Sequence, residues 1–309
     1  MQLSTLKKLA KNKRARAAEV KLKIAENHCP IPSSSLLIIG GKVNKGEEKP
    51  DNKQKPKDFI KLEVLHAFKK MIHKKDPVVE VITTSSGESA ESFKEYKKVF
   101  EELGISTINQ IHHEKRSEVL EDPLHDRIKN ADAFFFTGGD QLKITSIYGG
   151  TTFLTLLKER YIYESIVISG TSAGAMALST PMIYAGSDEV QELGGAIKVA
   201  VGLEFLKDVC VDTHFVHRGR FVRMAQVVVT NPTCIGIGIE EDTAIIVRNG
   251  LEIEVIGTGL VIILEGFHIK EAHMDDFSSD KPITIRDIRM HMLSDGNKYR
   301  IPQMNPPHK

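Results

Sequence analysis

Short apolar runs alternate with amphipathic segments up to about residue 170. A short apolar run between glycine or polar residues is typical of a buried strand, and apolar residues three and four apart indicate a helix. By these criteria the strands are 36–39, 78–82, 105–111, 133–136 and 166–169, and the helices are 59–73, 88–103 and one near 115–130. Strands that alternate with helices form βαβ units, so the pattern predicts an α/β fold with a mostly parallel sheet and helices on both faces.

Beyond residue 205 the pattern becomes richer in strands. The predicted strands there are 209–212, 235–239, 244–247, 252–256 and 261–264, with one helix near 218–229. Residues 42–58 are rich in Lys, Glu and Pro and are predicted to form a loop. We find no internal repeat and no linker within 33–300. The sequence therefore predicts one α/β domain over 33–300, preceded by an arm over 1–32 and followed by a short tail over 301–309.

The composition is that of an ordinary globular protein. The chain has 309 residues, of which 41% are hydrophobic, and 42 Lys and Arg stand against 41 Asp and Glu. These values exclude disordered, collagen-like and disulfide-dense chains. No apolar run approaches the roughly 20 residues of a membrane span, and a net charge of +1 gives no overall signature of nucleic-acid binding. We therefore expect neither a membrane nor a nucleic acid as partner.

The positive charge is concentrated in the N-terminal arm. Residues 1–29 contain eight basic and two acidic residues, a net charge of +6, so the other 280 residues carry about −5. The segment has no apolar core of the kind that a secretory signal requires. A solvated helix or frayed terminus is the favoured interpretation. Contact with a membrane surface, RNA or a partner, and a transit peptide, are the alternatives.

The cysteines and histidines give no pattern of a disulfide or metal site. Cys29, Cys210 and Cys234 are odd in number and widely spaced, and the last two lie in apolar strand-like runs. Buried reduced thiols are therefore expected, which favours a cytoplasmic location. The histidines within 112–114 and 214–217 are not joined by further ligands at a metal-binding spacing. No metal is expected.

A candidate nucleophile follows one of the strands. In open α/β sheets, ligands bind beyond the carboxyl ends of the strands. Residues 170–174, Gly-Thr-Ser-Ala-Gly, fit the pattern G-x-S-x-G between an apolar strand and a helix. In that context the serine sits on a tight turn that exposes its hydroxyl, so Ser172 is predicted to be a nucleophile. A glycine-rich turn without catalytic function is the alternative.

A serine nucleophile needs a base, and the base needs an orienting acid. His214 comes directly after the strand 209–212, on the same predicted edge of the sheet. The acidic run 240–242 follows the strand 235–239 and supplies the acid. The chain order Ser, His, acid differs from the Ser, acid, His order of the α/β-hydrolases.

Four segments together resemble a serine peptidase family that contains cyanophycinase and aspartyl dipeptidase. They occur in the same order as in that family, at similar spacings, and the resemblance covers about 36–265. The segments are 137–141 (TGGDQ), 170–175 (GTSAGA), Asp212-x-His214-Phe215 with three following arginines, and 236–244 (GIGIEEDTA). The resemblance implies a doubly wound α/β fold related to the class I glutamine amidotransferases, and a homodimer.

The resemblance also implies roles for individual residues. Ser172 is the nucleophile, His214 the general base and then acid, and Glu241 the orienting carboxylate, with Glu240 the less favoured acid. The turn at Gly138 and Gly139, with the amide of Ala173, supplies the donors of an oxyanion hole. The residues implied in substrate binding are Gln141, Asp212, Thr213, Arg218, Arg220 and Arg223. The three arginines suit carboxylate groups, although a solvated basic helix face is the alternative interpretation of their pattern. The carboxylate of Asp212 can pair with an arginine either of the protein or of the substrate.

The function implied is hydrolysis of cyanophycin, a poly-aspartate with arginine on each β-carboxyl, to β-Asp-Arg dipeptides by a serine exopeptidase. No metal or organic cofactor is needed. A dipeptidase for aspartyl or isoaspartyl peptides is the alternative within the family, and a non-catalytic binding protein is the third possibility. Two departures affect the substrate: Thr213 stands where the family usually has Gln, and 42–45 (KVNK) replaces an acidic stretch.

Overall fold

The computed structural model describes residues 30–45, 62–122, 124–185, 197–273 and 284–302, with side chains omitted at 271–273. The chain divides into a unit Met1–Ile31 and a unit Pro32–Lys309, and the second is described below. The basic arm with Cys29, most of the loop expected over 42–58, and most of the tail expected over 301–309 lie outside the described residues. The domain limits expected from the sequence therefore stay predictions.

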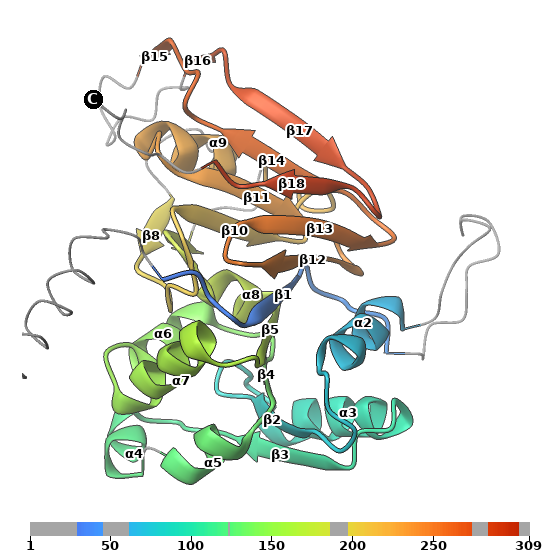
Figure 1. Ribbon diagram of the computed structural model, residues 1–309. Coiled ribbons are helices and arrows are strands. Elements are labelled where there is room, and N and C mark those ends of the chain that lie inside the picture. The colour runs from blue at the N-terminus through green and yellow to red at the C-terminus, as the bar shows by residue number, and fades with distance from the viewer. Residues whose placement is uncertain (1–29, 46–61, 123, 186–196, 274–283, 303–309) are drawn as a thin grey trace, which may run out of the picture. The chain divides into compact units, whose positions relative to one another are not determined.

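The larger sheet has eight strands, and its centre is parallel (Figure 1). In order across the sheet they are β18 (Lys298–Arg300), β13 (Glu252–Gly257), β12 (Thr243–Arg248), β1 (Ser35–Ile39), β5 (Val167–Thr171), β4 (Ala133–Phe136), β2 (Val78–Ile82) and β3 (Thr107–Ile111). The strands from β1 to β3 in this order pair in parallel, whereas β12, β13 and β18 pair antiparallel.

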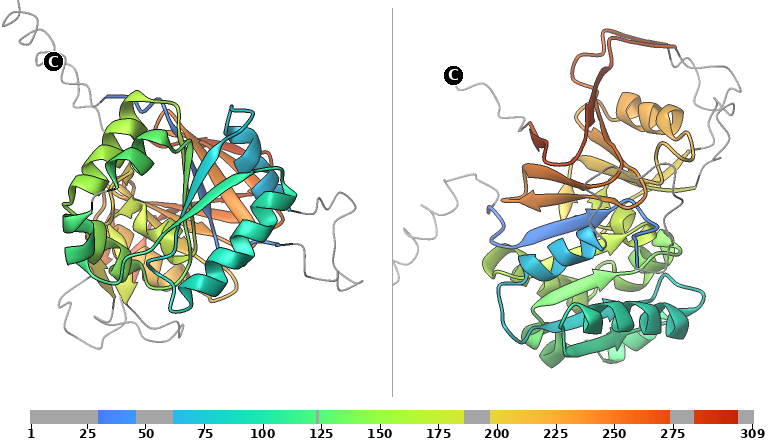
Figure 2. Two further views of the ribbon diagram at one scale, coloured as in Figure 1. Left: turned by 90° about the horizontal axis from the view of Figure 1, so that it is seen from below. Right: turned by 90° about the vertical axis from the view of Figure 1, so that its right-hand side faces the viewer.

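Helices cover both faces of the parallel strands, because residues of both faces are apolar. In β1, Leu36 and Ile38 belong to one hydrophobic cluster, and Leu37 and Ile39 belong to the other. Figure 2 (left) shows the blue-to-teal helices on one side of the strands and the green helices on the other. The first group is α2 (Glu63–Met71) and α3 (Ser89–Glu102); the second includes α4 (Arg116–Glu121), α5 (His125–Asn130), α6 (Gln141–Tyr148) and α7 (Thr152–Tyr163). The doubly wound α/β fold predicted from the sequence is confirmed.

The C-terminal strands form a second sheet, which the sequence pattern did not predict. In order it contains β17 (Arg289–Leu293), β14 (Val261–Glu265), β11 (Ile235–Ile239), β10 (Val209–Thr213), β6 (Ser179–Thr180) and β9 (Leu206–Lys207). The strands β10 and β11 are parallel neighbours, and helix α9 (Phe221–Thr230) packs on β11 through Met224 and Val228. Two hairpin-like pairs complete the structure: β7 (Met182–Ala185) with β8 (Lys198–Ala200), and β15 (Glu271–His273) with β16 (Thr284–Arg286).

Most predicted elements agree with the structure to within four residues, and one does not. The helix expected near 115–130 consists of two shorter helices, α4 and α5. Asp122, which caps α4, has an extended backbone with φ −130° and ψ 90°. A residue before proline disfavours helical backbone, and the sequence has Pro at 123, so the helix ends there. Over the described ranges, no helix combines the length and the apolar composition required to cross a bilayer.

Candidate active site

Ser172 occupies a sharp turn between strand β5 and the short helix α8 (Ala173–Ala177). Its backbone has φ 51° and ψ −118°, which is unusual for a residue with a side chain. The following glycine is required by space, because a Cβ atom at Gly174 would lie 2.3 Å from the carbonyl oxygen of Phe136. The G-x-S-x-G segment therefore forms the tight, strained turn that exposes a serine hydroxyl.

Ser172, His214 and Glu241 form a continuous hydrogen-bonded chain. The Oγ of Ser172 lies 3.0 Å from Nε2 of His214. The other ring nitrogen of His214, Nδ1, lies 2.7 Å from Oε1 of Glu241. His214 and Glu241 follow the parallel neighbours β10 and β11, which explains why side chains 27 residues apart in sequence meet. The first distance is within the range that proton transfer from serine to histidine requires, and the second is a hydrogen bond that can orient the imidazole.

The backbone after β1 holds these three segments together. Residues 39–41 accept a hydrogen bond from the backbone at, or next to, each predicted triad residue. The bonds are Ser172 N–H to Ile39 O (3.1 Å), His214 N–H to Gly40 O (2.9 Å) and Asp242 N–H to Gly41 O (3.0 Å). The end of β1 therefore fixes the relative positions of the segments of the two sheets that carry Ser172, His214 and Glu241.

The electrostatic surroundings keep the imidazole neutral and the carboxylate charged. Burial lowers the pKa of His214, and the charges of Arg218 and Arg220 lower it further, against the opposing effect of Glu241. Burial alone would raise the pKa of Glu241, but hydrogen bonds from His214 and Lys42 outweigh it and lower that pKa. At neutral pH the geometry thus combines a hydroxyl, a neutral imidazole able to accept its proton, and an ionised carboxylate.

Glu240 has a different role from its neighbour. Its Oε2 accepts hydrogen bonds from the backbone N–H of Val216 (2.6 Å) and of His217 (2.9 Å). These bonds stabilise the turn that follows His214, and the contact with the imidazole is made by Glu241 alone of the two. The structure thus places the favoured acid against the histidine.

The predicted oxyanion donors lie around the serine. Ala173 is the residue directly after Ser172, at the first turn of α8. Gly138 is adjacent in space: a Cβ atom there would lie 3.4 Å from Cβ of Ser172. Gly139 follows with φ +137°, a conformation that residues other than glycine rarely adopt.

Ser85 holds the turn that contains these glycines. Its Oγ lies 2.9 Å from the carbonyl oxygen of Thr137 and 2.9 Å from that of Gly138. In a trans peptide the C=O and N–H groups point in opposite directions. The bond to Gly138 O therefore turns the N–H of Gly139 away from Ser85.

The structure places two of the three arginines against Asp212, inside the protein. Arg220 and Arg223 are each 8% exposed, and Asp212 is fully buried. Nη1 of Arg220 lies 3.0 Å from Oδ1 of Asp212, and Nε of Arg223 lies 2.6 Å from Oδ2. A buried carboxylate needs such partners, and the two guanidinium groups neutralise it. Arg218 is exposed, and its backbone N–H donates to His214 O.

Gln141 and Thr213, the other residues implied in substrate binding, are also held within the protein. Nε2 of Gln141 donates to the carbonyl oxygen of Ile183 at 2.9 Å. Thr213 is 1% exposed, and its hydroxyl has no hydrogen-bond partner among the described residues. A role of either in substrate binding stays a prediction.

A cavity of about 450 Å³ opens beside the serine and the histidine. Its wall opposite them comes from the segment after β1 and from helix α3. Lys45 forms an ion pair with Glu95 there, and its Nζ lies 4.3 Å from the centre of the Tyr96 ring. The lining residues are Lys42, Val43, Asn44, Lys45, Ser92, Glu95, Tyr96, Gly138, Thr171, Ser172 and His214.

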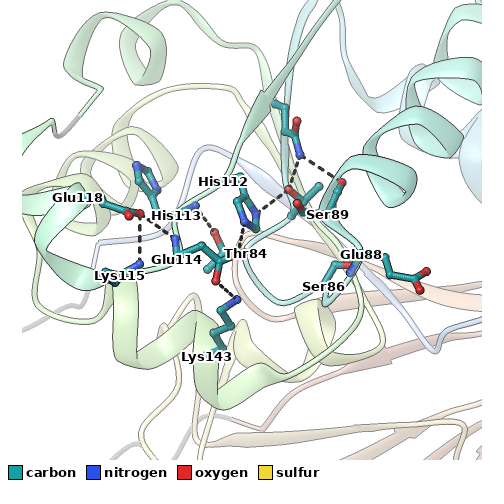
Figure 3. Close-up of polar contacts among 12 residues, drawn as sticks. Thr84, Ser86, Glu88, Ser89, His112, His113, Glu114, Lys115, Glu118 and Lys143 are labelled. Carbon is teal, nitrogen blue, oxygen red and sulfur yellow. Dashed lines mark hydrogen bonds and ion pairs between the residues drawn. The ribbon is translucent and has the colours of Figure 1, made fainter.

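A second polar cluster lies where β2 and β3 end (Figure 3). Both ring nitrogens of His112 are engaged: Nδ1 lies 3.1 Å from Oγ1 of Thr83, and Nε2 lies 2.6 Å from Oε1 of Glu114. Glu114 in turn accepts a bond from Lys143 at the start of α6 (2.9 Å). Among the described residues, no three His, Cys, Asp or Glu side chains are grouped in a way that would hold a metal ion.

A model of peptidase family S51 matches residues 55–255, more than half of the chain. The chain belongs to this family. It is 28% identical over 266 residues to the cyanophycinase of Geminocystis herdmanii (strain PCC 6308), covering 86% of this chain and 93% of that protein. It is 26% identical over 270 residues to the cyanophycinase of Trichormus variabilis (strain ATCC 29413 / PCC 7937), covering 87% and 86%. The resemblance inferred from the four segments is confirmed.

A solved structure shares the fold. The crystal structure of a peptidase from an acI-B1 Actinobacterium matches with a TM-score of 0.58 at 21% identity, over 88% of this chain and 98% of that one. Membership of family S51, together with the similarity to cyanophycinases, makes the protein a serine-type peptidase and therefore a hydrolase.

For a peptidase of family S51 the cavity wall is the part of the site that sequence reasoning missed. Lys45, Glu95 and Tyr96 line the cavity beside Ser172, yet none of them belongs to a motif. The pair on α3 gives no signal in the sequence, because its position depends on how the helix packs against the sheet. Lys42 was visible only as a departure from an acidic stretch.

Proposed function

We propose that this member of family S51 is an exopeptidase that hydrolyses cyanophycin to β-Asp-Arg dipeptides, with Ser172, His214 and Glu241 as its catalytic triad. The observation that carries the proposal is the chain of hydrogen bonds from serine to histidine to carboxylate, at 3.0 and 2.7 Å. The similarity to cyanophycinases over more than four fifths of the chain supports the substrate.

The first half of the reaction forms an acyl-enzyme. Oγ of Ser172 attacks the scissile carbonyl carbon while Nε2 of His214 takes the hydroxyl proton. Glu241 stabilises the imidazolium that results and holds its Nδ1–H in place. The carbonyl oxygen becomes an oxyanion that accepts hydrogen bonds from the amides of the Gly138–Gly139 turn and of Ala173. The imidazolium then donates its proton to the leaving amine, and the C–N bond breaks.

The second half releases the acyl group. A water molecule gives a proton to Nε2 of His214 and attacks the ester carbonyl, so that the same base acts again. Collapse of the tetrahedral intermediate breaks the bond to Oγ of Ser172, which recovers its proton from His214. The chemistry uses only these side chains and water.

Incubation of the protein with insoluble cyanophycin, followed by mass analysis of the soluble products, tests the proposal. The expected result is β-Asp-Arg dipeptides from the wild type and none from a folded Ser172→Ala variant, which also resists acylation by a serine-directed β-lactone. Cleavage of aspartyl or isoaspartyl dipeptides without release from the polymer supports the alternative dipeptidase. Absence of both hydrolysis and acylation in the wild type contradicts the proposal and favours a binding protein.

A further inference from the structure

Two of the three arginines expected to recognise substrate carboxylates bind a carboxylate of the protein instead. Arg220 and Arg223 are buried and bind Asp212. Arg218 is exposed, and an anionic substrate that reaches the serine meets further positive charge elsewhere. The cavity beside the serine supplies two lysines from the segment after β1, Lys42 and Lys45.

The two lysines differ in how far they are engaged. The ammonium group of Lys45 is paired with Glu95 and lies over the ring of Tyr96, so protein groups surround it. Lys42 is 60% exposed, and its Nζ lies 3.2 Å from Oε1 of Glu241. An ammonium group has three donors. Among the described residues Glu241 is its ion partner, and Lys42 is one of the residues that line the cavity.

The backbone conformation that places Lys42 in the wall of the cavity is strained. Lys42 has φ 36°, in the left-handed region that residues with a side chain rarely adopt, and it follows Gly41 with φ 105°. The turn is fastened to the acid loop on both sides: Asp242 N–H donates to Gly41 O, and Asn44 N–H donates to Oδ1 of Asp242. An exposed ion pair adds little to stability. Strained backbone that presents a cation beside a nucleophile therefore points to function.

We propose that Lys42 is a specificity residue that binds a carboxylate of the substrate in the cavity beside Ser172. The inference rests on the proposed function and defines the chemical class of the substrate residue next to the scissile bond as acidic. One carboxylate uses only part of the donor capacity of an ammonium group, so Lys42 can bind a substrate carboxylate while it stays paired with Glu241. Two carboxylates of a cyanophycin-like chain fit: the α-carboxylate of an arginine branch and the C-terminal carboxylate of the backbone.

Three synthetic trimers of the β-Asp-Arg unit distinguish between these two carboxylates. One has all carboxylates free, one has a C-terminal carboxamide, and one has carboxamides on the arginine branches. The wild type is expected to prefer the free trimer over one of the two amides. Because the amide loses a hydrogen bond to a charged group, we expect kcat/KM to be about 10- to 100-fold higher for the free trimer. In Lys42→Gln, kcat/KM is expected to fall on the free trimer only, so that the preference is lost. Lys42→Arg is expected to retain part of the preference.

Lys74→Gln is the matched control, because Lys74 is also an exposed lysine, 53% accessible, bound to a carboxylate, Asp132, at 3.0 Å. It should behave as the wild type. The inference is overturned if Lys42→Gln lowers kcat/KM equally on all three trimers, or if this variant keeps the preference of the wild type for the free trimer.

Binding measured without turnover separates this inference from the proposed function. The Kd values of the three trimers are determined by calorimetry for Ser172→Ala and for Ser172→Ala combined with Lys42→Gln. Tighter binding of the free trimer that depends on Lys42 supports the inference even where the wild type hydrolyses none of them, a result that would contradict only the proposed function. Equal Kd values for free and amidated trimers overturn it.

Discussion

Gly41 lies directly against the imidazole ring of His214: a Cβ atom at Gly41 would be 2.4 Å from both Cε1 and Nε2. Nε2 is the atom that contacts Ser172. The glycine is therefore part of the wall that sets the position of the ring.

Gly41→Ala should displace the imidazole and lower kcat by about 100-fold or more, because small misplacements of reacting groups have effects of that size. The φ of +105° adds backbone strain of about 1–2 kcal/mol. Gly104→Ala is the matched control, since Gly104 has φ +79° and open space around it. It should lose similar stability in thermal unfolding and keep full activity; equal activity losses in the two variants would mean that strain alone is responsible.

Glu241→Gln should reduce kcat by about 10⁴-fold with little change in the melting temperature. The amide keeps the shape of the side chain but no longer stabilises the imidazolium or fixes the tautomer with Nδ1–H. Glu240→Gln is the control, because Glu240 bonds to the backbone of Val216 and His217 instead. Steady-state kinetics of both variants check the assignment, and a larger loss in Glu240→Gln would reverse it.

The pH dependence of kcat/KM should follow the deprotonation of His214. Burial and the charges of Arg218 and Arg220 hold its pKa below the ordinary 6.5, against the opposing effect of Glu241. A general base acts when neutral, so activity should rise with pH, with a midpoint below 6.5. Lys42→Gln leaves the charge of Glu241 uncompensated, which favours the imidazolium and should move the midpoint to higher pH. A midpoint above 6.5 in the wild type would show that another group controls the rate.

Ser85→Ala should lower kcat about tenfold with KM unchanged. Its hydroxyl fixes the carbonyl groups of Thr137 and Gly138, and without it the proposed oxyanion donors lose their fixed orientation. The effect is smaller than the 100- to 1,000-fold typical of removing a donor itself. Ser86→Ala is the control, because its Oγ accepts only the Glu88 N–H among the described contacts. A rise in KM with unchanged kcat would place Ser85 in substrate binding.

The parts of the fold that the sequence predicted best are those with local signals. The strands 78–82, 133–136 and 235–239 agree with the structure to the residue, because each is a short, mostly apolar run followed by polar residues. Ser172 was identifiable for a similar reason: the turn that exposes it needs glycines at fixed offsets.

The parts that the sequence did not predict depend on contacts between distant segments. Alternation of apolar residues shows that the C-terminal segments are strands, but it does not show with which strands they pair, so the second sheet was not foreseen. Likewise, the helical spacing of Arg220 and Arg223 shows that they share a face. It does not show whether Asp212, on a neighbouring strand, pairs with them or with an arginine of the substrate.

Asp212→Ala separates the two interpretations of the arginines. If they are held by Asp212 for stability, its removal leaves two buried guanidinium groups without their carboxylate, and the free energy of unfolding should fall by about 3–5 kcal/mol. Glu254→Ala is the control: Glu254 pairs with the exposed Arg248 at 2.6 Å, and its loss should stay within about 1 kcal/mol. Urea unfolding of both variants measures the difference. If Asp212→Ala unfolds like the wild type but no longer hydrolyses anionic peptides, substrate recognition by the arginines is favoured. A buried ion pair that adds nothing to the free energy of unfolding must be retained for another reason.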